Sequence, residues 1–101
     1  MAVVSLGSHQ QFQKALFLLD RGEIERGETM LREVLNAAER AEDRGLLATV
    51  RLCLGQLLIE LGRAEEAMGL LRRVAALDEY DDLVAHERRQ AIEALSRLDE
   101  Q

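Results

Sequence analysis

The side chains of this sequence that could do chemistry are few and lie far apart. There is one cysteine, Cys53, and there are two histidines, His9 and His86, and none of them has a spacing typical of a metal site or a catalytic pair. Cys53 lies between Leu52 and Leu54, so it is predicted to be a buried and unreactive thiol. The histidines fall near the expected starts of helices, where no cluster of ligands surrounds them.

The densest group of carboxylates is the segment 78–82, Asp-Glu-Tyr-Asp-Asp. It lacks the glycine turn and bidentate glutamate of a calcium loop, so helix capping and solubility explain it. The same segment could attract a basic partner in a salt-sensitive manner. The chain contains no phosphate-binding glycine loop and no nucleophile paired with a base. The sequence therefore predicts a protein that is not an enzyme and has no metal and no cofactor.

Composition indicates one all-helical domain. The chain has 101 residues, of which 48% are hydrophobic and 32% charged, and it contains no proline. The net charge is −6, and residues 78–101 alone hold three basic and eight acidic side chains. A chain with this charge has no basic surface that could bind phosphates. An acidic lipid surface would repel its C-terminal segment. We therefore expect neither nucleic acid nor a membrane as a partner.

Cysteine usage and the start of the chain suggest a location. A single cysteine cannot form an internal disulfide, which favours a reducing compartment. No segment approaches the roughly 18 apolar residues of a membrane span, and residues 1–6 lack the basic start of a signal peptide. We expect a cytoplasmic protein. Twelve arginines against the single Lys14 fit a GC-rich bacterial genome.

Glycines and apolar periodicity predict five helices. Gly62 is expected to end one helix in a left-handed conformation before the next begins, and Gly22 does the same earlier in the chain. Ser8 with Gln11 fits a capping box, Gly45 is expected to end the second helix, and Asp81 or Asp82 is expected to cap the fifth. The expected helices cover residues 9–21, 23–43, 48–61, 63–77 and 83–98.

An internal repeat with an offset of 40 residues relates the two hairpins. The matching pairs are Gly22 and Gly62, Gly27 and Ala67, Leu31 and Leu71, and Val34 and Val74. The sequence thus predicts a tail (1–8), two hairpins (9–45 and 46–78) and a capping helix (79–101). On that last helix Ala91, Leu95 and Leu98 are expected to face inward, and Glu87, Arg88, Glu93 and Arg97 outward.

The second hairpin, from about Ala48 to Asp78, resembles the tetratricopeptide repeat. The positions that match its signature are Arg51, Leu54, Gly55, Leu58, Ala67, Leu71 and Glu79. Leu-Gly and the later Ala are kept, leucines replace two aromatics, and the Trp and closing Pro are absent. The resemblance implies an all-α array of two lengthened tetratricopeptide-like hairpins plus the capping helix. It also implies an adaptor or scaffold that acts through protein–protein interaction without catalysis.

In that family the first helix of each hairpin lines a concave groove that binds a partner peptide. Carried over, the resemblance implies partner-binding residues Phe12, Leu16, Leu19, Leu52, Gln56 and Ile59. The Lys, Arg and Asn of family members that hold a terminal carboxylate are absent, so an apolar or amphipathic partner is expected. The acidic C-terminal third favours basic flanks on that partner. Two alternatives stay open. The apolar stripe could be core, or it could form a homodimer to which residues 1–6 contribute.

Overall fold

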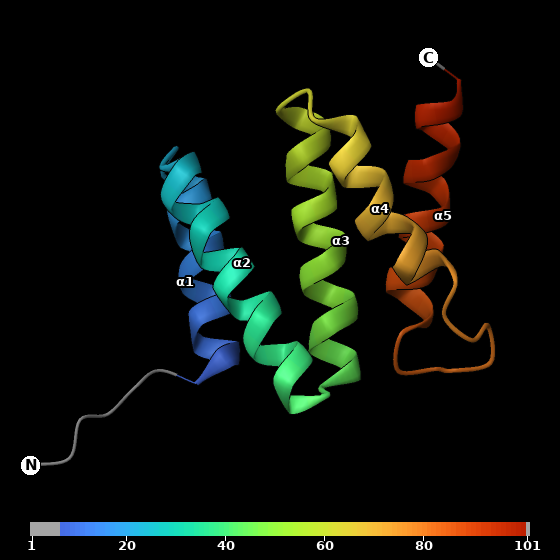
Figure 1. Ribbon diagram of the computed structural model, residues 1–101, viewed down its shortest axis with the longest axis horizontal. Helices are drawn as coiled ribbons and strands as arrows, with labels where there is room; N and C mark the ends of the chain where they lie inside the picture. Colours follow the sequence, from blue (N-terminus) through green and yellow to red (C-terminus); the bar gives the residue numbers. More distant parts are fainter. Residues whose placement is uncertain (1–6, 101) are drawn as a thin grey trace, which may run out of the picture.

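The structure, a computed structural model, describes residues 7–100, which form five α-helices and no strand (Figure 1). The helices are α1 (Ser8–Asp20), α2 (Ile24–Ala41), α3 (Arg44–Glu60), α4 (Ala64–Ala75) and α5 (Ala85–Asp99). The predicted all-α class is confirmed for these residues. The suggested contribution of residues 1–6 to an interface lies outside the described part of the chain.

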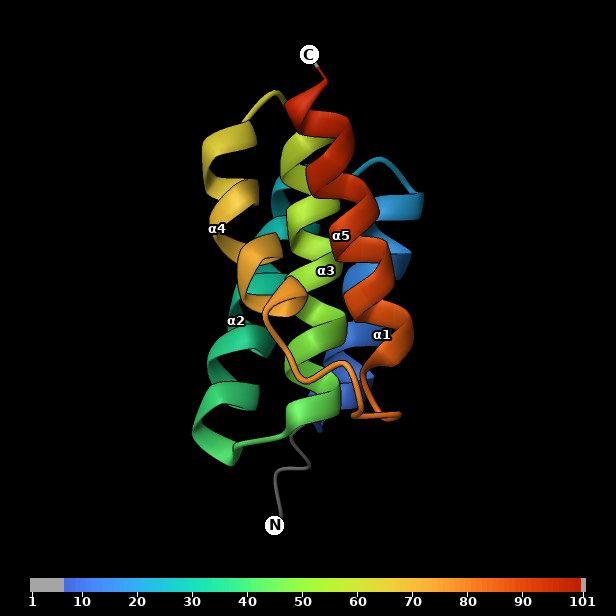
Figure 2. The same cartoon turned by 90° about the vertical axis from the view of Figure 1, so that its right-hand side faces the viewer.

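α3 is the central helix of the described residues (Figure 1). α2 and α4 lie on one side of α3, and α1 and α5 lie on the other side (Figure 2). Each helix packs against the next one in the chain, and α3 also contacts α5. Because α3 is covered from several sides, its sequence is apolar over most of its circumference, and Val50, Leu54 and Leu58 are fully buried. α1, α3 and α5 run in one direction, and α2 and α4 run in the other (Figure 1).

The two turns within the hairpins have the same structure. Gly22 and Gly62 have φ angles of 82° and 77°, which favour glycine. The amide of Glu23 donates to the carbonyl of Leu18 over 2.9 Å, and the amide of Arg63 donates to Leu58 over 2.8 Å. These bonds close the Schellman pattern that satisfies the free carbonyls of a helix end. The predicted glycine turns are confirmed.

Small residues let the two helices of each hairpin approach closely. In the second hairpin Gly55 of α3 faces Ala67 of α4, and a Cβ on Gly55 would lie 2.9 Å from Cδ2 of Leu71. The leucine therefore occupies the space that a side chain at position 55 would need. Gly55 is required here for packing, not for its backbone conformation.

The first hairpin makes the same close contact with the two small residues exchanged. Its glycine, Gly27, lies on the second helix and faces the carbonyl of Ala15 on the first. A Cβ on Gly27 would lie 2.5 Å from Cδ2 of Leu19. Each hairpin thus contains one Gly and one Ala at the crossing, and a leucine from the partner helix fills the space beside the Gly.

The boundary between α2 and α3 differs from the prediction. Gly45 does not end a helix but lies in the first turn of α3, which starts at Arg44 and not near Ala48. α2 ends instead at Glu42, whose φ is 54°, and the side chain of Asp43 accepts a hydrogen bond from the amide of Leu46 over 3.2 Å. An aspartate at the N-cap stabilises the start of a helix more than a glycine in the first turn destabilises it.

Replacing Glu42 by glycine is expected to raise the free energy of unfolding by about 1 kcal/mol, because an L side chain is strained in the left-handed region. Urea unfolding monitored by circular dichroism measures the change. Ala41→Gly, one position earlier and inside the helix, is the matched control and should destabilise the protein. A loss of stability in Glu42→Gly would contradict this interpretation of the junction.

Two further boundaries are corrected. The first helix is capped one residue earlier than predicted, because the amide of Gly7 donates to Oε1 of Gln10 over 3.0 Å. The fifth helix starts at Ala85, since the side chain of Asp81 stabilises a turn before the helix by accepting from the amide of Leu83.

The inward face of α5 also differs in part from the prediction. Ala91 is buried, with Leu95 and Leu98 packed against the core, as predicted. Glu87 and Arg88, however, are half-buried and do not face outward. Arg88 donates from Nε to the carbonyl of Leu77 over 3.1 Å, and this bond ties α5 to the end of α4.

Candidate functional site

Two hollows lie side by side on the face formed by α1, α3 and α5. The α1–α3 hollow has a volume of about 300 Å³, and its lining consists of Leu16, Leu19, Asp20, Ile24, Cys53, Gln56, Leu57 and Glu60. The α3–α5 hollow has a volume of about 450 Å³, and its lining consists of Gln56, Ile59, Glu60, Ala94, Arg97 and Leu98. Gln56 and Glu60 of α3 line both hollows, so the two hollows adjoin along α3 and are taken together as one groove. We call this surface the groove.

Four of the six predicted partner-binding residues line the groove. Leu16 and Leu19 line the α1–α3 hollow, Ile59 lines the α3–α5 hollow, and Gln56 lies between the two. The three apolar members are half-buried, so their side chains are packed on one side and open on the other. At these positions the predicted residues lie on the face of α1 and of α3 that lines the groove.

Phe12 and Leu52 do not line the groove. Phe12 is 8% exposed and Leu52 is 5% exposed, and both belong to the apolar core. Spacing along a helix fixes the direction of a side chain but not how deeply neighbouring helices cover it. For these two residues the core alternative is correct.

Several groove residues were not predicted. Asp20 and Glu60 are the last residues of α1 and α3, and Arg97 and Leu98 come from α5, which was expected only to cover the core. Sequence offers one signal for the two acids, since they are 40 residues apart and each comes two residues before a turn glycine. Nothing in the sequence indicated that α5 would form the second wall.

Cys53 is half-buried and lines the α1–α3 hollow, so it is less covered than predicted. Burial raises the pKa of its thiol, and the carboxylate of Glu87 raises that pKa further. A raised pKa keeps the sulfur protonated near neutral pH, where a thiol is a weak nucleophile. The cysteine therefore contributes apolar surface to the hollow.

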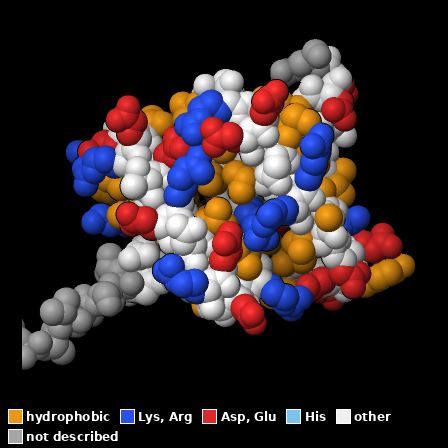
Figure 3. Space-filling model, viewed as in Figure 1, with side chains coloured by type: hydrophobic (Ala, Val, Ile, Leu, Met, Phe, Trp, Pro, Cys, Tyr) orange, Lys and Arg blue, Asp and Glu red, His pale blue; other side chains and the backbone are white. Residues whose placement is uncertain are grey.

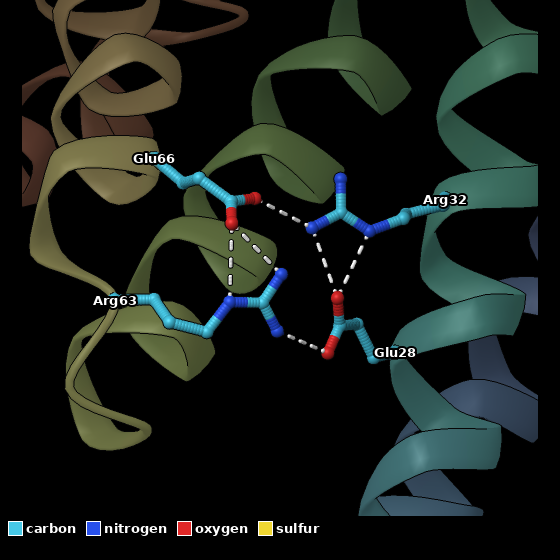
Figure 4. Close-up of polar contacts among 4 residues, drawn as sticks. All are labelled: Glu28, Arg32, Arg63 and Glu66. Carbon is cyan, nitrogen blue, oxygen red and sulfur yellow. Dashed lines mark hydrogen bonds and ion pairs between the residues drawn. The ribbon is translucent and has the colours of Figure 1, made fainter.

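The opposite face carries a network of four charged residues between α2 and α4 (Figure 4). Glu28 accepts hydrogen bonds from Nε of Arg32 over 3.0 Å and from Nη1 of Arg63 over 2.8 Å. Glu66 accepts from the same two arginines, over 2.9 Å from Arg32 and 2.9 Å from Nη2 of Arg63. The network joins the two hairpins. Basic and acidic side chains are mixed over the surrounding face, and neither sign dominates (Figure 3).

Glu28 is the member of this network whose loss should be measurable, because its side chain is only 16% exposed. The hydrogen bond from Arg63, with a smaller effect from Arg32, holds the pKa of Glu28 below its usual range. A lowered pKa in the folded state stabilises the protein above the unfolded pKa, and this stability is lost as the pH falls through the folded pKa.

Glu28→Gln is accordingly expected to lower the free energy of unfolding by about 1 kcal/mol at neutral pH. The difference from the unmodified protein should shrink as the pH is lowered, since acid protonates Glu28 in the parent. Chemical unfolding at a series of pH values measures both effects. Glu33→Gln, exposed on the same helix and without an ion pair among residues 7–100, is the control. A deficit that is constant with pH would contradict the account.

Within residues 7–100 no group of three or more His, Cys, Asp and Glu side chains is placed to hold a metal ion. His9 lies 3.5 Å from a carboxylate oxygen of Asp43, and His86 is hydrogen-bonded to Gln90 over 3.0 Å. Both histidines are exposed. In the same range no helix has the length and apolar character required to cross a membrane.

The chain matches no protein-family model, no curated protein and no solved structure.

Proposed function

We propose that this chain is a tetratricopeptide-like adaptor that binds a segment of another protein in the groove and catalyses no reaction. The observation that carries the proposal is the groove itself, in which half-buried apolar side chains of α1, α3 and α5 surround the exposed amide of Gln56. Apolar side chains that remain accessible in a concave surface are typical of a site that binds a peptide or helix.

The repeat supports the tetratricopeptide-like part of the proposal. Turn glycines, small residues at the helix crossing and buried leucines recur at the same offset in both hairpins. In this arrangement α5 occupies the place of the first helix of a third repeat, which explains why it lies beside α3 and on the same side of the molecule as α1 (Figure 2). A cytoplasmic location belongs to the same proposal and is supported by the single cysteine, which favours a reducing compartment.

The alternative is a scaffold in which a second copy of the chain covers the groove. The same apolar lining favours it, because a two-hairpin array buries less surface than the three or so repeats usually needed for stability. In this case the groove would be closed in solution and could not take a foreign segment.

Two measurements on the purified chain separate these functions. Light scattering after size exclusion, over a range of concentrations, reports the oligomeric state, and panning a random 12-residue peptide library reports capture. The adaptor predicts a monomer that selects peptides which compete with one another for one site. A dimer at every concentration that selects no peptide would overturn the adaptor and support self-assembly.

A further inference from the structure

The lining of the α1–α3 hollow is apolar below and acidic at one end. Leu16, Leu19 and Leu57 form apolar walls, and Asp20 and Glu60 are its two charged residues. Among residues 7–100, no basic residue lines this hollow. The neighbouring α3–α5 hollow has a basic residue, Arg97. The groove as a whole therefore has two carboxylates and one guanidinium in its lining, and both carboxylates line the α1–α3 hollow.

Both acids occupy positions that are unfavourable for the helices that carry them. Asp20 and Glu60 end α1 and α3, and the two helices run in parallel, so their negative dipole ends lie at the same end of the groove (Figure 1). A carboxylate at a helix C-terminus is repelled by the dipole, and neither helix has a basic residue in its last turn. The two carboxylates therefore destabilise the C-terminal ends of α1 and α3.

The arginines that follow these helices do not neutralise the acids. The guanidinium of Arg21 lies over the ring of Phe17, 5.5 Å from its centroid. Arg63 is bonded to Glu28 and Glu66 on the opposite face. Among residues 7–100, neither Asp20 nor Glu60 takes part in an ion pair. Both carboxylates are exposed, so they are accessible to a cationic group from outside.

We infer that the α1–α3 hollow receives a lysine or arginine side chain of the partner segment, an inference that rests on the proposed function. The aliphatic stem packs on Leu16 and Leu19, and the cationic head lies between Asp20 and Glu60. The partner is therefore an amphipathic segment whose basic residue lies at the end of the groove formed by the C-termini of α1 and α3. An apolar residue of the same segment occupies the α3–α5 hollow.

The experiment compares the peptides selected by the unmodified chain with those bound by the double variant Asp20→Asn/Glu60→Gln. The control, Glu79→Gln/Asp82→Asn, makes the same change of charge in the loop between α4 and α5, away from both hollows. Gln56→Trp, which fills the groove between the hollows, shows whether a given peptide binds there at all. Thermal unfolding of each variant without peptide is recorded in parallel.

The expected result is enrichment of lysine or arginine among the selected peptides and an affinity at least ~10-fold weaker for Asp20→Asn/Glu60→Gln, with less than a ~3-fold change for the control. The double variant should also melt at a higher temperature, because it removes two carboxylates from helix C-termini. Peptides that bind in the groove without this enrichment, and equally well to the double variant, would overturn the inference and leave the adaptor in place. Peptides indifferent to Gln56→Trp would overturn both.

Discussion

Leu71→Ala is expected to lower the free energy of unfolding by about 3 kcal/mol, among the largest effects of any single substitution in this chain. Leu71 is fully buried, and its side chain fills the space beside Gly55 where α3 and α4 cross. Truncation leaves a cavity that two helices in close contact cannot collapse to fill. Urea unfolding followed by circular dichroism measures the loss.

The same contact predicts that Leu71→Ala and Gly55→Ala are not additive. Gly55→Ala alone should cost about 2 kcal/mol, because the new methyl group meets a leucine that has no free space to move into. In the double variant the methyl group enters the cavity left by the leucine, so the combined loss should be smaller than the sum by about 1 kcal/mol.

Gly69→Ala is the control for this cycle. Gly69 lies on the exposed side of α4, and a Cβ there would meet no atom within 4 Å. The substitution should raise the free energy of unfolding by about 0.5–1 kcal/mol through helix propensity alone. Additive losses for the two substitutions at the crossing, or a destabilising Gly69→Ala, would contradict the described packing.

Gln56→Trp is expected to weaken the binding of library-selected peptides at least ~10-fold, the second large effect. Gln56 is exposed at the junction of the two hollows, so a tryptophan there occupies space in both without disturbing the core. Fluorescence anisotropy of a labelled selected peptide measures the affinity.

Asn36→Trp provides the matched comparison, because it replaces an exposed amide on α2 that lines neither hollow. It should leave the affinity within about 2-fold of the parent. Equal affinities for the two tryptophan variants would place the peptide somewhere other than the groove. The more obvious test, charge introduced at Phe12 or Leu52, is unsuitable because both side chains are buried and the fold would be lost.

The helices could be predicted because local signals determine them. Gly22 and Gly62 are required by the left-handed ends of α1 and α3, and the buried pair Leu31 and Leu71 follows the helical period. The junction at Glu42 could not be predicted in this way, since a glutamate in the left-handed region has no sequence signature. There the packing of α2 and α3 outweighs the local preference.

Groove residues could be predicted from the sequence only on α1 and α3, the two helices related by the 40-residue repeat. Leu16, Leu19, Gln56 and Ile59 follow from the spacing along α1 and α3. Arg97 and Leu98 of α5 line the groove because of where α5 packs on α3. Helical periodicity does not predict how two helices are placed relative to each other. The depth of Phe12 and Leu52 was missed for the same reason.

Binding of the partner segment in the groove is tested most directly by a map of amide chemical-shift changes in the labelled protein on addition of a library-selected peptide. The account predicts that the changes cluster on α1, α3 and α5, around Leu16, Gln56 and Leu98, while the α2 and α4 face remains unchanged. Changes centred on α2 and α4, around the network of Glu28 and Arg63, would contradict it.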